Sequence, residues 1–389
     1  MSSAPRLLVV DDDKMIRTYL RGAAEGLGYE VVTAGETEEF RQLFRSVQPD
    51  VVLLDLVIPG TDGIEMLKFL AAAHCKVPVV LMSGLDERAI HAAQRLGAAH
   101  GLRMFGGLEK PFDREMLETV LKRCGLERRN VAGGNLLEAI DRGELRLHYQ
   151  PQVAPLYRWA LGVEALLRWE HPEYGLLMPA YFLPMAEKSD VICSVTRWVC
   201  SEALTQLTRW KREGHDLTLS INLSARDIKD GSFPCWLEEQ VRSQDLDPSR
   251  IILELTEHEA MSDIDQALEL LTRLRLKGFQ LSIDDFGTGY SSLAMLQQVP
   301  FCELKIDKCF VMQSGVDPEA RIIVKSVVNL GHTLGLRVVA EGVEEEEIFV
   351  RMRDLEVDVI QGYHTGRPMS AEALGKWLAK EPMAARRTA

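Results

Sequence analysis

The sequence predicts an α/β protein in two parts: a doubly wound sheet of five parallel strands, followed by a closed (β/α) barrel. Two observations lead to this prediction. Short apolar runs alternate with helical stretches along most of the 389 residues, which is typical of parallel sheets. In the C-terminal two thirds of the chain these runs end on polar side chains, and barrel strands bring their carboxyl ends together at one mouth, where active sites lie.

Composition and charge narrow the class of protein. The net charge of −13 argues against a partner such as DNA or an anionic membrane, because such binding needs a broad basic surface. The seven cysteines are scattered without a Cys-x-x-Cys pair, so we expect a cytoplasmic protein. Leu7–Val10 is too short for the apolar part of a signal peptide, and no apolar stretch approaches the roughly 20 residues that span a bilayer.

Residues 1–125 carry the alternation expected of the first domain. The apolar runs are Leu7–Val10, Val51–Leu54 and Val77–Met82, and the helical stretches are Lys14–Gly26, Ile64–Ala73 and Glu87–Leu96. The pattern predicts the doubly wound parallel sheet. Sheets of this kind place their binding sites at the carboxyl ends of the strands.

Polar side chains stand where these strands should end. They are Asp11, Asp12, Asp55, Ser83 and Lys110. Neighbouring carboxylates raise each other's pKa unless a cation binds between them. Asp11, Asp12 and Asp55 therefore predict a magnesium site. Magnesium beside Asp55 would neutralise an incoming phosphoryl group while that carboxylate attacks it, with Lys110 pairing with the transferred charge and Ser83 donating a hydrogen bond. The alternative to a site is that these are ordinary polar side chains exposed to solvent at the ends of strands.

Together these segments resemble the receiver domain of two-component response regulators, whose fold is flavodoxin-like. The matching segments are Val9-Val10-Asp11-Asp12, Leu54-Asp55, Pro59-Gly60-Thr61-Asp62-Gly63, Ser83-Gly84 and Lys110-Pro111-Phe112. The resemblance implies that Asp55 accepts phosphate from a cognate histidine kinase and that Lys110–Pro111 is a cis peptide. One position departs from the pattern, because Gly107 stands where such domains usually carry an aromatic switch residue. The sequence leaves open whether Phe105 takes its place.

Residues 126–134 hold charges and a Gly-Gly pair and predict a linker, which places the second domain at residues 135–389. Its expected strands are Leu145–Val153, Ala160–Trp169, Leu217–Leu223, Ile251–Leu255, Gln280–Asp284, Glu303–Ile306, Arg337–Ala340 and Val357–Ile360. Its expected helices are Val195–Glu213, Ile264–Lys277, Arg321–Leu334 and Glu344–Leu355. The order predicts a modified TIM-type (β/α) barrel. Too few residues join the first two strands for a helical crossover, so the first strand should run antiparallel.

The polar residues that follow the barrel's apolar runs suit divalent metals and phosphoryl chemistry. They are Glu164, Asn222, Glu254, Asp284, Asp285, Lys305, Glu341 and Gln361. A turn that begins at Asp285 would bring that carboxylate beside Asp284 and allow two metals to lie roughly 3.5–4 Å apart. Lys305 would hold or deprotonate the attacking water, with its pKa lowered by the metal charge. The residues alone leave two alternatives to two-metal hydrolysis. The acidic side chains could form only salt bridges, or they could serve a one-metal lyase or enolase-type reaction.

Glu164-Ala165-Leu166-Leu167-Arg168 resembles the signature of EAL-domain phosphodiesterases, which cleave cyclic di-GMP to linear pGpG. The other matching segments are Tyr149-Gln150-Pro151, Asn222-Leu223-Ser224, Glu254-Leu255-Thr256-Glu257, Asp284 to Gly289, Leu304-Lys305-Ile306-Asp307, Ala340 to Glu344 and Gln361-Gly362-Tyr363. The resemblance spans about 250 residues. It implies two Mg²⁺ or Mn²⁺ ions in the barrel, besides the one ion predicted above for the receiver. The implied barrel ligands are Glu164, Asn222, Glu254, Asp284, Asp285 and Glu341.

The same resemblance implies roles for the other residues. Lys305 and Glu341 would act on the water and the second metal, with Gln361 near that water. The substrate contacts would be Gln150, Arg168 and Asn222. Glu257 would hold the loop that follows Asp285. The hypothesis is a phosphorylation-regulated cyclic di-GMP phosphodiesterase, a homodimer or higher homo-oligomer; the alternatives are a catalytically silent cyclic di-GMP sensor that signals through a protein partner, and a protein in which the receiver alone carries the function.

Overall fold

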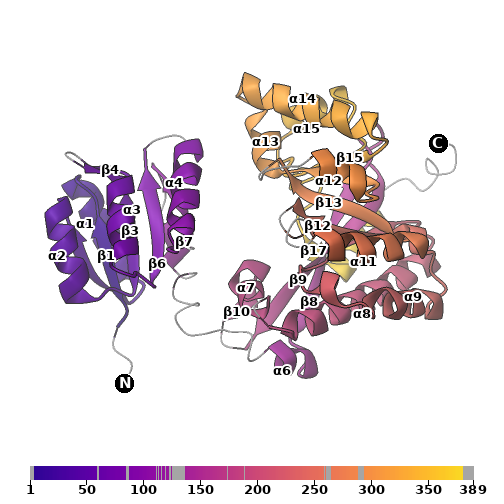
Figure 1. Ribbon diagram of the computed structural model, residues 1–389, viewed down its shortest axis with the longest axis horizontal. Helices are drawn as coiled ribbons and strands as arrows, with labels where there is room; N and C mark the ends of the chain where they lie inside the picture. The colour runs from indigo at the N-terminus through magenta and orange to yellow at the C-terminus, as the bar shows by residue number, and fades with distance from the viewer. Residues whose placement is uncertain are drawn as a thin grey trace. The chain divides into compact units, whose positions relative to one another are not determined.

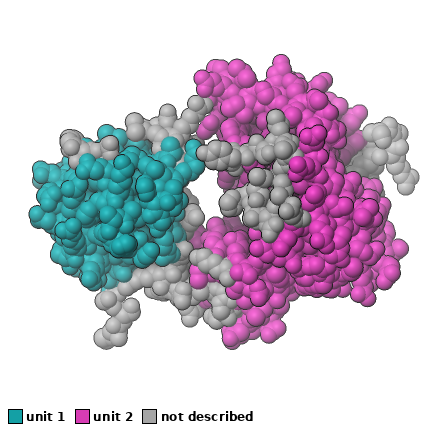
Figure 2. Space-filling model, in the orientation of Figure 1, with its two compact units in different colours: residues 1–131 teal, residues 132–389 magenta. Residues whose placement is uncertain are grey.

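The computed structural model shows two compact units, residues 1–131 and 132–389 (Figure 2), which we describe separately. It describes residues 4–379 except 59–60, 85–86, 111, 113, 115, 119, 122–123, 125–135, 173, 188, 258, 260–263 and 288–292. Within these residues, none of the helices combines the length and the apolar character that crossing a membrane requires.

The first unit is a five-stranded parallel sheet in the order β2-β1-β3-β6-β7 (Figure 1), which confirms the predicted fold. Its strands are β1 (Arg6–Val10), β2 (Glu30–Ala34), β3 (Val51–Asp55), β6 (Pro78–Ser83) and β7 (Arg103–Glu109). Its helices are α1 (Lys14–Glu25), α2 (Thr37–Val47), α3 (Gly63–Ala72) and α4 (Glu87–Ala99), and β4 (Val57–Ile58) pairs with β5 (Thr61–Asp62) in a small hairpin.

Apolar side chains cover both faces of this sheet, which explains why its strands read as continuous apolar runs. Leu8 and Val10 of β1 point into one buried cluster, which α2, α3 and α4 complete. Leu7 and Val9 point into the other cluster, which α1 completes together with Leu117, Leu121 and Cys124. The carboxyl ends of the strands are thereby left to carry the polar residues.

Helix α4 packs directly on Gly107 in β7. A Cβ atom at position 107 would lie 2.3 Å from Cγ2 of Ile90, closer than two carbon atoms can approach. Phe105 packs instead against the cluster on the other face of the sheet. The space that an aromatic side chain at position 107 would need is therefore filled by the helix.

The second unit contains a closed barrel in the strand order β9-β11-β12-β13-β14-β15-β16-β8. Its strands are β8 (Leu145–Val153), β9 (Ala160–His171), β11 (Thr218–Asn222), β12 (Ile251–Thr256), β13 (Gln280–Phe286), β14 (Glu303–Ile306), β15 (Arg337–Ala340) and β16 (Val359–Gln361), with β10 (Gly175–Leu177) and β17 (Met369–Ser370) beside them. Strand β8 closes the barrel and runs antiparallel to both neighbours, as predicted. The six residues between β8 and β9 are too few for a crossover helix.

Helices surround this barrel, and most of them lie between successive strands in the chain; the first precedes all the strands and the last follows them (Figure 1). They are α6 (Leu136–Asp141), α7 (Leu183–Ala186), α8 (Val191–Arg212), α9 (Phe233–Ser243), α11 (Ile264–Leu276), α12 (Leu293–Gln298), α13 (Lys308–Gln313), α14 (Pro318–Thr333), α15 (Glu346–Asp354) and α16 (Ala371–Leu378). Three short 3₁₀ helices, η1 (Pro179–Tyr181), η2 (Asp227–Lys229) and η3 (Pro248–Arg250), complete the described elements. The predicted (β/α) barrel with one antiparallel strand is confirmed.

Candidate active site

A fully buried lysine lies among four carboxylates at the centre of the barrel's polar cluster. The Nζ atom of Lys305 is 2.6 Å from Oε1 of Glu341, 2.9 Å from Oε2 of Glu254, 3.5 Å from Oδ1 of Asp284 and 3.6 Å from Oε2 of Glu164. Each of these side chains comes from a different strand or strand end. The structure therefore gathers residues that are far apart in the sequence around one atom.

Strand register explains this convergence. Asn222 of β11 pairs with Glu254 of β12, and Thr256 of β12 pairs with Asp284 of β13. Because alternate side chains of a strand point the same way, residues at these levels share the interior of the barrel. Glu164 ends an apolar run but lies in the middle of β9, as the predicted strand Ala160–Trp169 requires. The strand continues to His171 because β8 and β10 go on pairing with it.

Asp285 reaches the site through a β-bulge, and the predicted turn at this position is wrong. Strand β13 continues to Phe286, but its register with β14 shifts between Ile283 and Phe286. Asp285 has a φ of 53°, in the left-handed region, and its N–H donates to Oδ1 of Asp284 at 2.9 Å. The bulge lets two consecutive carboxylates face one side, since consecutive residues of a regular strand face opposite sides.

A network of amides orients the carboxylate of Glu164. Nδ2 of Asn222 donates to its Oε1 at 2.9 Å, and Nε2 of Gln361 donates to its Oε2. The same Gln361 amide donates to Oε1 of Gln150 at 3.2 Å and accepts from Nε2 of Gln152 at 3.0 Å. Gln152 was not among the predicted residues, although its spacing of two from Gln150 places both side chains on one face of β8.

Burial and mutual charge shift the protonation of this cluster. Burial raises the pKa of Glu341 to about 8, with Lys305 opposing the shift. Burial and the neighbouring Asp284 raise the pKa of Asp285 to about 7. Burial also raises the pKa of Glu254 well above its usual range. These carboxyl groups therefore tend to keep their protons, and bound cations would favour their ionised form.

Lys305 shows the opposite shift to the one expected from metal charge. Burial alone disfavours the ammonium, but Asp284, Glu164, Glu254 and Glu341 together raise the pKa of Lys305 well above its ordinary value. The surrounding carboxylates outweigh burial here, so Lys305 is a cation in this arrangement. The predicted lowering of its pKa would require cations to neutralise the same carboxylates.

The donor set fits divalent cations that prefer oxygen. Carboxylate oxygens of Asp284, Asp285 and Glu341 lie within 4.8 Å of one another. Oε1 of Glu254 is buried and has no hydrogen-bond partner among the described residues, so this oxygen fits the coordination of a cation. Several carboxylates with one amide and no described cysteine or histidine in the group suit Mg²⁺ or Mn²⁺.

The first unit brings its five predicted residues together at one end of its sheet. Nζ of Lys110 is 2.7 Å from Oδ2 of Asp11 and 2.6 Å from Oδ2 of Asp55, and carboxylate oxygens of Asp11, Asp12 and Asp55 lie within 4.8 Å of one another. The Lys110 N–H donates to the carbonyl of the buried Ser83 at 2.7 Å. The predicted cis peptide involves Pro111, which lies outside the described residues.

Two family models match the chain. The model of the response regulator receiver domain matches residues 7–122, and the model of the EAL domain matches residues 134–368. The chain belongs to the EAL domain family, with a receiver domain ahead of the EAL domain.

Three comparisons with known proteins extend this assignment. The cyclic di-GMP phosphodiesterase RocR of Pseudomonas aeruginosa is 30% identical over 378 residues, which cover 93% of this chain and 96% of RocR. The bifunctional diguanylate cyclase/cyclic di-GMP phosphodiesterase MucR of the same organism is 44% identical over 241 residues, which cover 62% of this chain and 35% of MucR. A solved structure of the PaMucR phosphodiesterase in complex with c-di-GMP has a TM-score of 0.60 and 44% identity, covering 62% of this chain and 98% of that one.

The chain spans only about a third of the length of several relatives. The matched share is 35% of MucR, 32% of an uncharacterised signalling protein of Caulobacter vibrioides and 32% of the oxygen sensor protein DosP of Escherichia coli. The similarity to these proteins is therefore confined to one part of each. RocR, in contrast, is matched along nearly its whole length.

Two more predicted residues of the EAL domain are Arg168 and Glu257. The structure describes the surroundings of the first, but not the whole loop that the second was expected to hold. Arg168 is 5% exposed; one of its nitrogens donates to the Leu167 carbonyl at 2.7 Å, and its Nε has no partner among the described residues. An unpaired buried donor suits the anionic substrate that was predicted for Arg168. Glu257 is buried, but the loop that it was expected to hold includes residues 288–292, which lie outside the described ones.

Sequence reasoning missed the role of Asp307. Its carboxyl group shares a hydrogen bond with that of Asp285, and it also accepts from the Cys309 N–H at 2.8 Å at the start of α13. Asp307 therefore connects a candidate ligand to the start of a helix. The sequence feature that could have identified Asp307 is its position two residues after Lys305, at the end of an apolar run.

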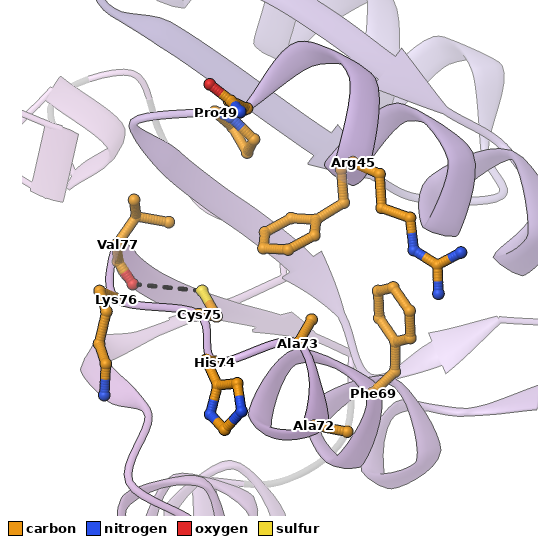
Figure 3. Close-up of a pocket in the computed structure, with 11 residues that line it drawn as sticks. Arg45, Pro49, Phe69, Ala72, Ala73, His74, Cys75, Lys76 and Val77 are labelled. Atoms are coloured by element: carbon orange, nitrogen blue, oxygen red, sulfur yellow. Dashed lines mark hydrogen bonds between the residues drawn. The ribbon is translucent and has the colours of Figure 1, made fainter.

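The receiver domain also contains a cavity of about 560 Å³ (Figure 3). Its walls include Phe69 and Cys75 near the end of α3, and Pro49 and Val77, which precede β3 and β6. The cavity thus lies at the amino ends of the strands. Asp55 lies at the carboxyl end of β3, so this cavity is separate from the candidate phosphoacceptor site.

Proposed function

We propose that the EAL domain hydrolyses cyclic di-GMP to linear pGpG with two divalent cations, and that phosphorylation of Asp55 in the receiver regulates this activity. The observation that carries the proposal is the buried Lys305 among four carboxylates, three of which have raised pKa values. The match to a cyclic di-GMP phosphodiesterase over 96% of its length supports it. We further propose residues 126–134 as the linker between the two domains.

The proposed mechanism assigns a task to each side chain. The cations would be held by Glu164, Asn222, Glu254, Asp284, Asp285 and Glu341. Bound there, they would supply positive charge to the scissile phosphate and acidify a water molecule. Lys305 donates hydrogen bonds that hold the water in line, and Gln361 keeps Glu164 in position. The water would lose one proton as its oxygen bonds to phosphorus, the bond from phosphorus to the 3′ oxygen would break, and the departing oxygen would take up one proton, so that the two proton transfers balance.

The substrate's second phosphate needs its own partner, and Arg168 supplies one. Its unpaired Nε would donate to a phosphate oxygen, and Gln150 would contact the substrate from the neighbouring strand β8. A charge-assisted hydrogen bond from a guanidinium is among the stronger interactions available for an anionic ligand. We propose Asn222 as a contact to both the substrate and a cation.

A hydrolysis assay with matched variants tests the proposed activity. The protein is incubated with cyclic di-GMP and Mg²⁺ or Mn²⁺, and the products are separated by chromatography. We expect pGpG from the wild type and a loss of at least about 100-fold in rate for Glu164→Ala. Glu170→Ala is the control, because Glu170 lies on the same strand with a 59% exposed side chain. Intact dinucleotide with measurable binding by the wild type would instead indicate the sensor.

Regulation by the receiver is tested separately. Hydrolysis is measured with and without a small-molecule phosphodonor for the wild type, for Asp55→Asn and for the control Asp50→Asn at the other end of β3. We expect the donor to change the rate of the wild type and of the control but not that of Asp55→Asn. Equal rates that ignore the donor in all three proteins would end the proposal of phosphorylation control.

We also propose the setting in which the protein works. A cognate histidine kinase would supply the phosphate, and the chain would act as a homodimer or higher homo-oligomer in the cytoplasm. All seven cysteines are free, which suits a reducing compartment. Light scattering on the purified protein, before and after the phosphodonor, measures the oligomer directly.

A further inference from the structure

We propose that the EAL domain binds a small aromatic α-amino acid in a cavity on the outside of the barrel, an inference that does not depend on the proposed hydrolysis. The cavity has a volume of about 320 Å³, which is close to the lower limit for small-molecule sites in proteins. Its walls come mainly from strand β8 and from helix α8, which packs against β8 (Figure 1).

The wall of this cavity contains a buried hydroxyl group without a partner. Tyr149 of β8 is 3% exposed, and its ring meets the edge of Trp210 with the ring centres 4.8 Å apart. Among the described residues, none forms a hydrogen bond with the Tyr149 hydroxyl. Since nearly all buried polar groups in proteins have a partner, this hydroxyl suits a ligand in the cavity that bonds to it.

The alternation of side chains along β8 separates this cavity from the candidate active site. Gln150 and Gln152 bond to Gln361 inside the barrel. Because successive residues of a strand face opposite sides, Leu147 and Tyr149 face outward, and both line the cavity. A ligand in the cavity would therefore lie on the outer face of the strand whose inner face carries Gln150.

Two opposite charges on α8 face the same hydroxyl. Glu202 and Arg209 both line the cavity. Burial raises the pKa of the Tyr149 hydroxyl, Glu202 adds to this rise and Arg209 opposes it, so both charged groups lie near the hydroxyl oxygen. Within the described part of the chain, neither Glu202 nor Arg209 forms a salt bridge, although a spacing of seven residues, close to two helical turns, places them on one face of α8.

The other polar groups of the cavity do not neutralise these two charges. Arg146 also lines the cavity, but its guanidinium pairs with Glu170 at 2.9 Å. The guanidinium of Arg209 donates to Oε1 of Gln206 at 3.5 Å, which is a long hydrogen bond to a neutral group. A carboxylate and a guanidinium are thus left facing one cavity, and a ligand that carries both signs of charge would satisfy both.

An α-amino acid has the required charges on neighbouring atoms. Its ammonium group would bond to Glu202, and its carboxylate would bond to Arg209 and accept a hydrogen bond from the Tyr149 hydroxyl. Hydrogen bonds between ionised groups are among the stronger ones in proteins. Trp198 and Leu147 are half-buried in the wall of the cavity and supply the apolar surface for an aromatic side chain.

Calorimetric titration of the full-length, Mg²⁺-loaded protein with L-phenylalanine tests this proposal. We expect one molecule to bind per chain with a Kd below about 1 mM. 3-Phenylpropionate lacks the ammonium group and 2-phenylethylamine lacks the carboxylate, so each should bind at least about tenfold more weakly. No saturable binding of L-phenylalanine, or equal affinities for the three compounds, would overturn the proposal.

Variants of the two charged residues assign the binding to this cavity. Glu202→Gln should bring the affinities for L-phenylalanine and 3-phenylpropionate together, because the partner of the ammonium group is lost. Arg209→Gln should do the same for L-phenylalanine and 2-phenylethylamine. Arg212→Gln is the control, since Arg212 is exposed at the end of α8 and does not line the cavity. Wild-type selectivity in both cavity variants would place the bound phenylalanine elsewhere and overturn the proposal.

Tyr149→Phe tests the buried hydroxyl separately. It should weaken the binding of L-phenylalanine by about tenfold and leave that of 2-phenylethylamine unchanged, because only the carboxylate accepts from the hydroxyl. The melting temperature of the free protein should stay at or above the wild-type value, since the hydroxyl that is removed has no partner among the described residues. Unchanged affinity for L-phenylalanine in a folded Tyr149→Phe protein would contradict the proposed site.

Discussion

The receiver and the barrel each surround one lysine with carboxylates at the carboxyl ends of parallel strands, but their balance of charge differs. Lys110 contacts two carboxylates, Asp11 and Asp55, and its side chain is 18% exposed. Lys305 is fully buried and has four carboxylates within 4.0 Å. The receiver lysine is more open to solvent and faces fewer carboxylates, which suits the proposed arrival of a phosphoryl group at Asp55. The barrel lysine is closed off from solvent and faces more carboxylates, which suits the proposed binding of two cations.

The largest expected effect comes from removing each lysine in turn. Lys305→Ala should lower kcat/KM for cyclic di-GMP by about 10²–10³-fold, since a buried donor in the reacting centre is lost. Lys110→Ala should leave hydrolysis by the unphosphorylated protein unchanged and abolish its response to a phosphodonor. Both rates come from the same chromatographic assay. Equal losses in the two variants would contradict the separate roles given to the two sites.

The bulge at Asp285 gives the next largest effect, through the affinity for metal. Asp285→Asn removes the charge but keeps a residue that tolerates a positive φ, and it should weaken Mn²⁺ binding by about 10–100-fold. Asp285→Ala should weaken binding as much and also lower the free energy of unfolding by about 1–2 kcal/mol, because alanine disfavours this conformation. Calorimetric titration and urea unfolding measure the two quantities. Wild-type affinity in Asp285→Asn would remove Asp285 from the ligand set.

Gly107 offers a smaller effect that is confined to the receiver. Gly107→Ala would place a methyl group 2.3 Å from Ile90, and pushing α4 outward should cost about 1–3 kcal/mol of receiver stability. Gly22→Ala in α1 is the control, since nothing lies within 4 Å of a Cβ atom there. Thermal unfolding followed by calorimetry should show a lower receiver transition and an unchanged barrel transition. A stable Gly107→Ala protein would mean that α4 packs less closely on β7.

The smallest effect is the response of metal binding to pH. Burial raises the pKa of Glu341 to about 8, and burial with Asp284 raises the pKa of Asp285 to about 7. Below these values each group holds a proton that must leave before a cation binds. The affinity for Mn²⁺ should therefore rise with pH up to about 8, by at most about tenfold per pH unit for each proton released, and level off above it. Titrations in buffers of different ionisation enthalpy count the protons, and Asp285→Asn should release fewer.

Much of the fold could be predicted from the sequence because buried parallel strands are short, apolar and ended by polar residues. Strands β8, β14 and β15 have the predicted bounds. The antiparallel course of β8 followed from the length of its connection alone. The prediction ended β9 at Trp169, two residues short of its observed end, because Glu170 and His171 extend the strand by pairing with β10.

Most of the candidate site residues were predicted from the ends of apolar runs, and Gln150, Arg168 and Glu257 from the family resemblance. The geometry of all of them required the structure. Two adjacent carboxylates do not reveal that Asp285 has a positive φ, since the bulge depends on the register between β13 and β14. The pKa of Lys305 depends on four partners brought in by different strands. Gln152 gains its interest only from Gln361, which lies 209 residues further along the chain. Local sequence patterns do not predict which distant segments of the chain come into contact.

Anomalous diffraction from a crystal of this protein soaked in Mn²⁺ tests the central claim that the barrel's excess negative charge exists to hold cations. We predict two manganese peaks in the barrel, bound by the carboxylates around Lys305, and one peak at Asp11, Asp12 and Asp55. A barrel without a peak, in a crystal whose receiver site is filled, would contradict the account.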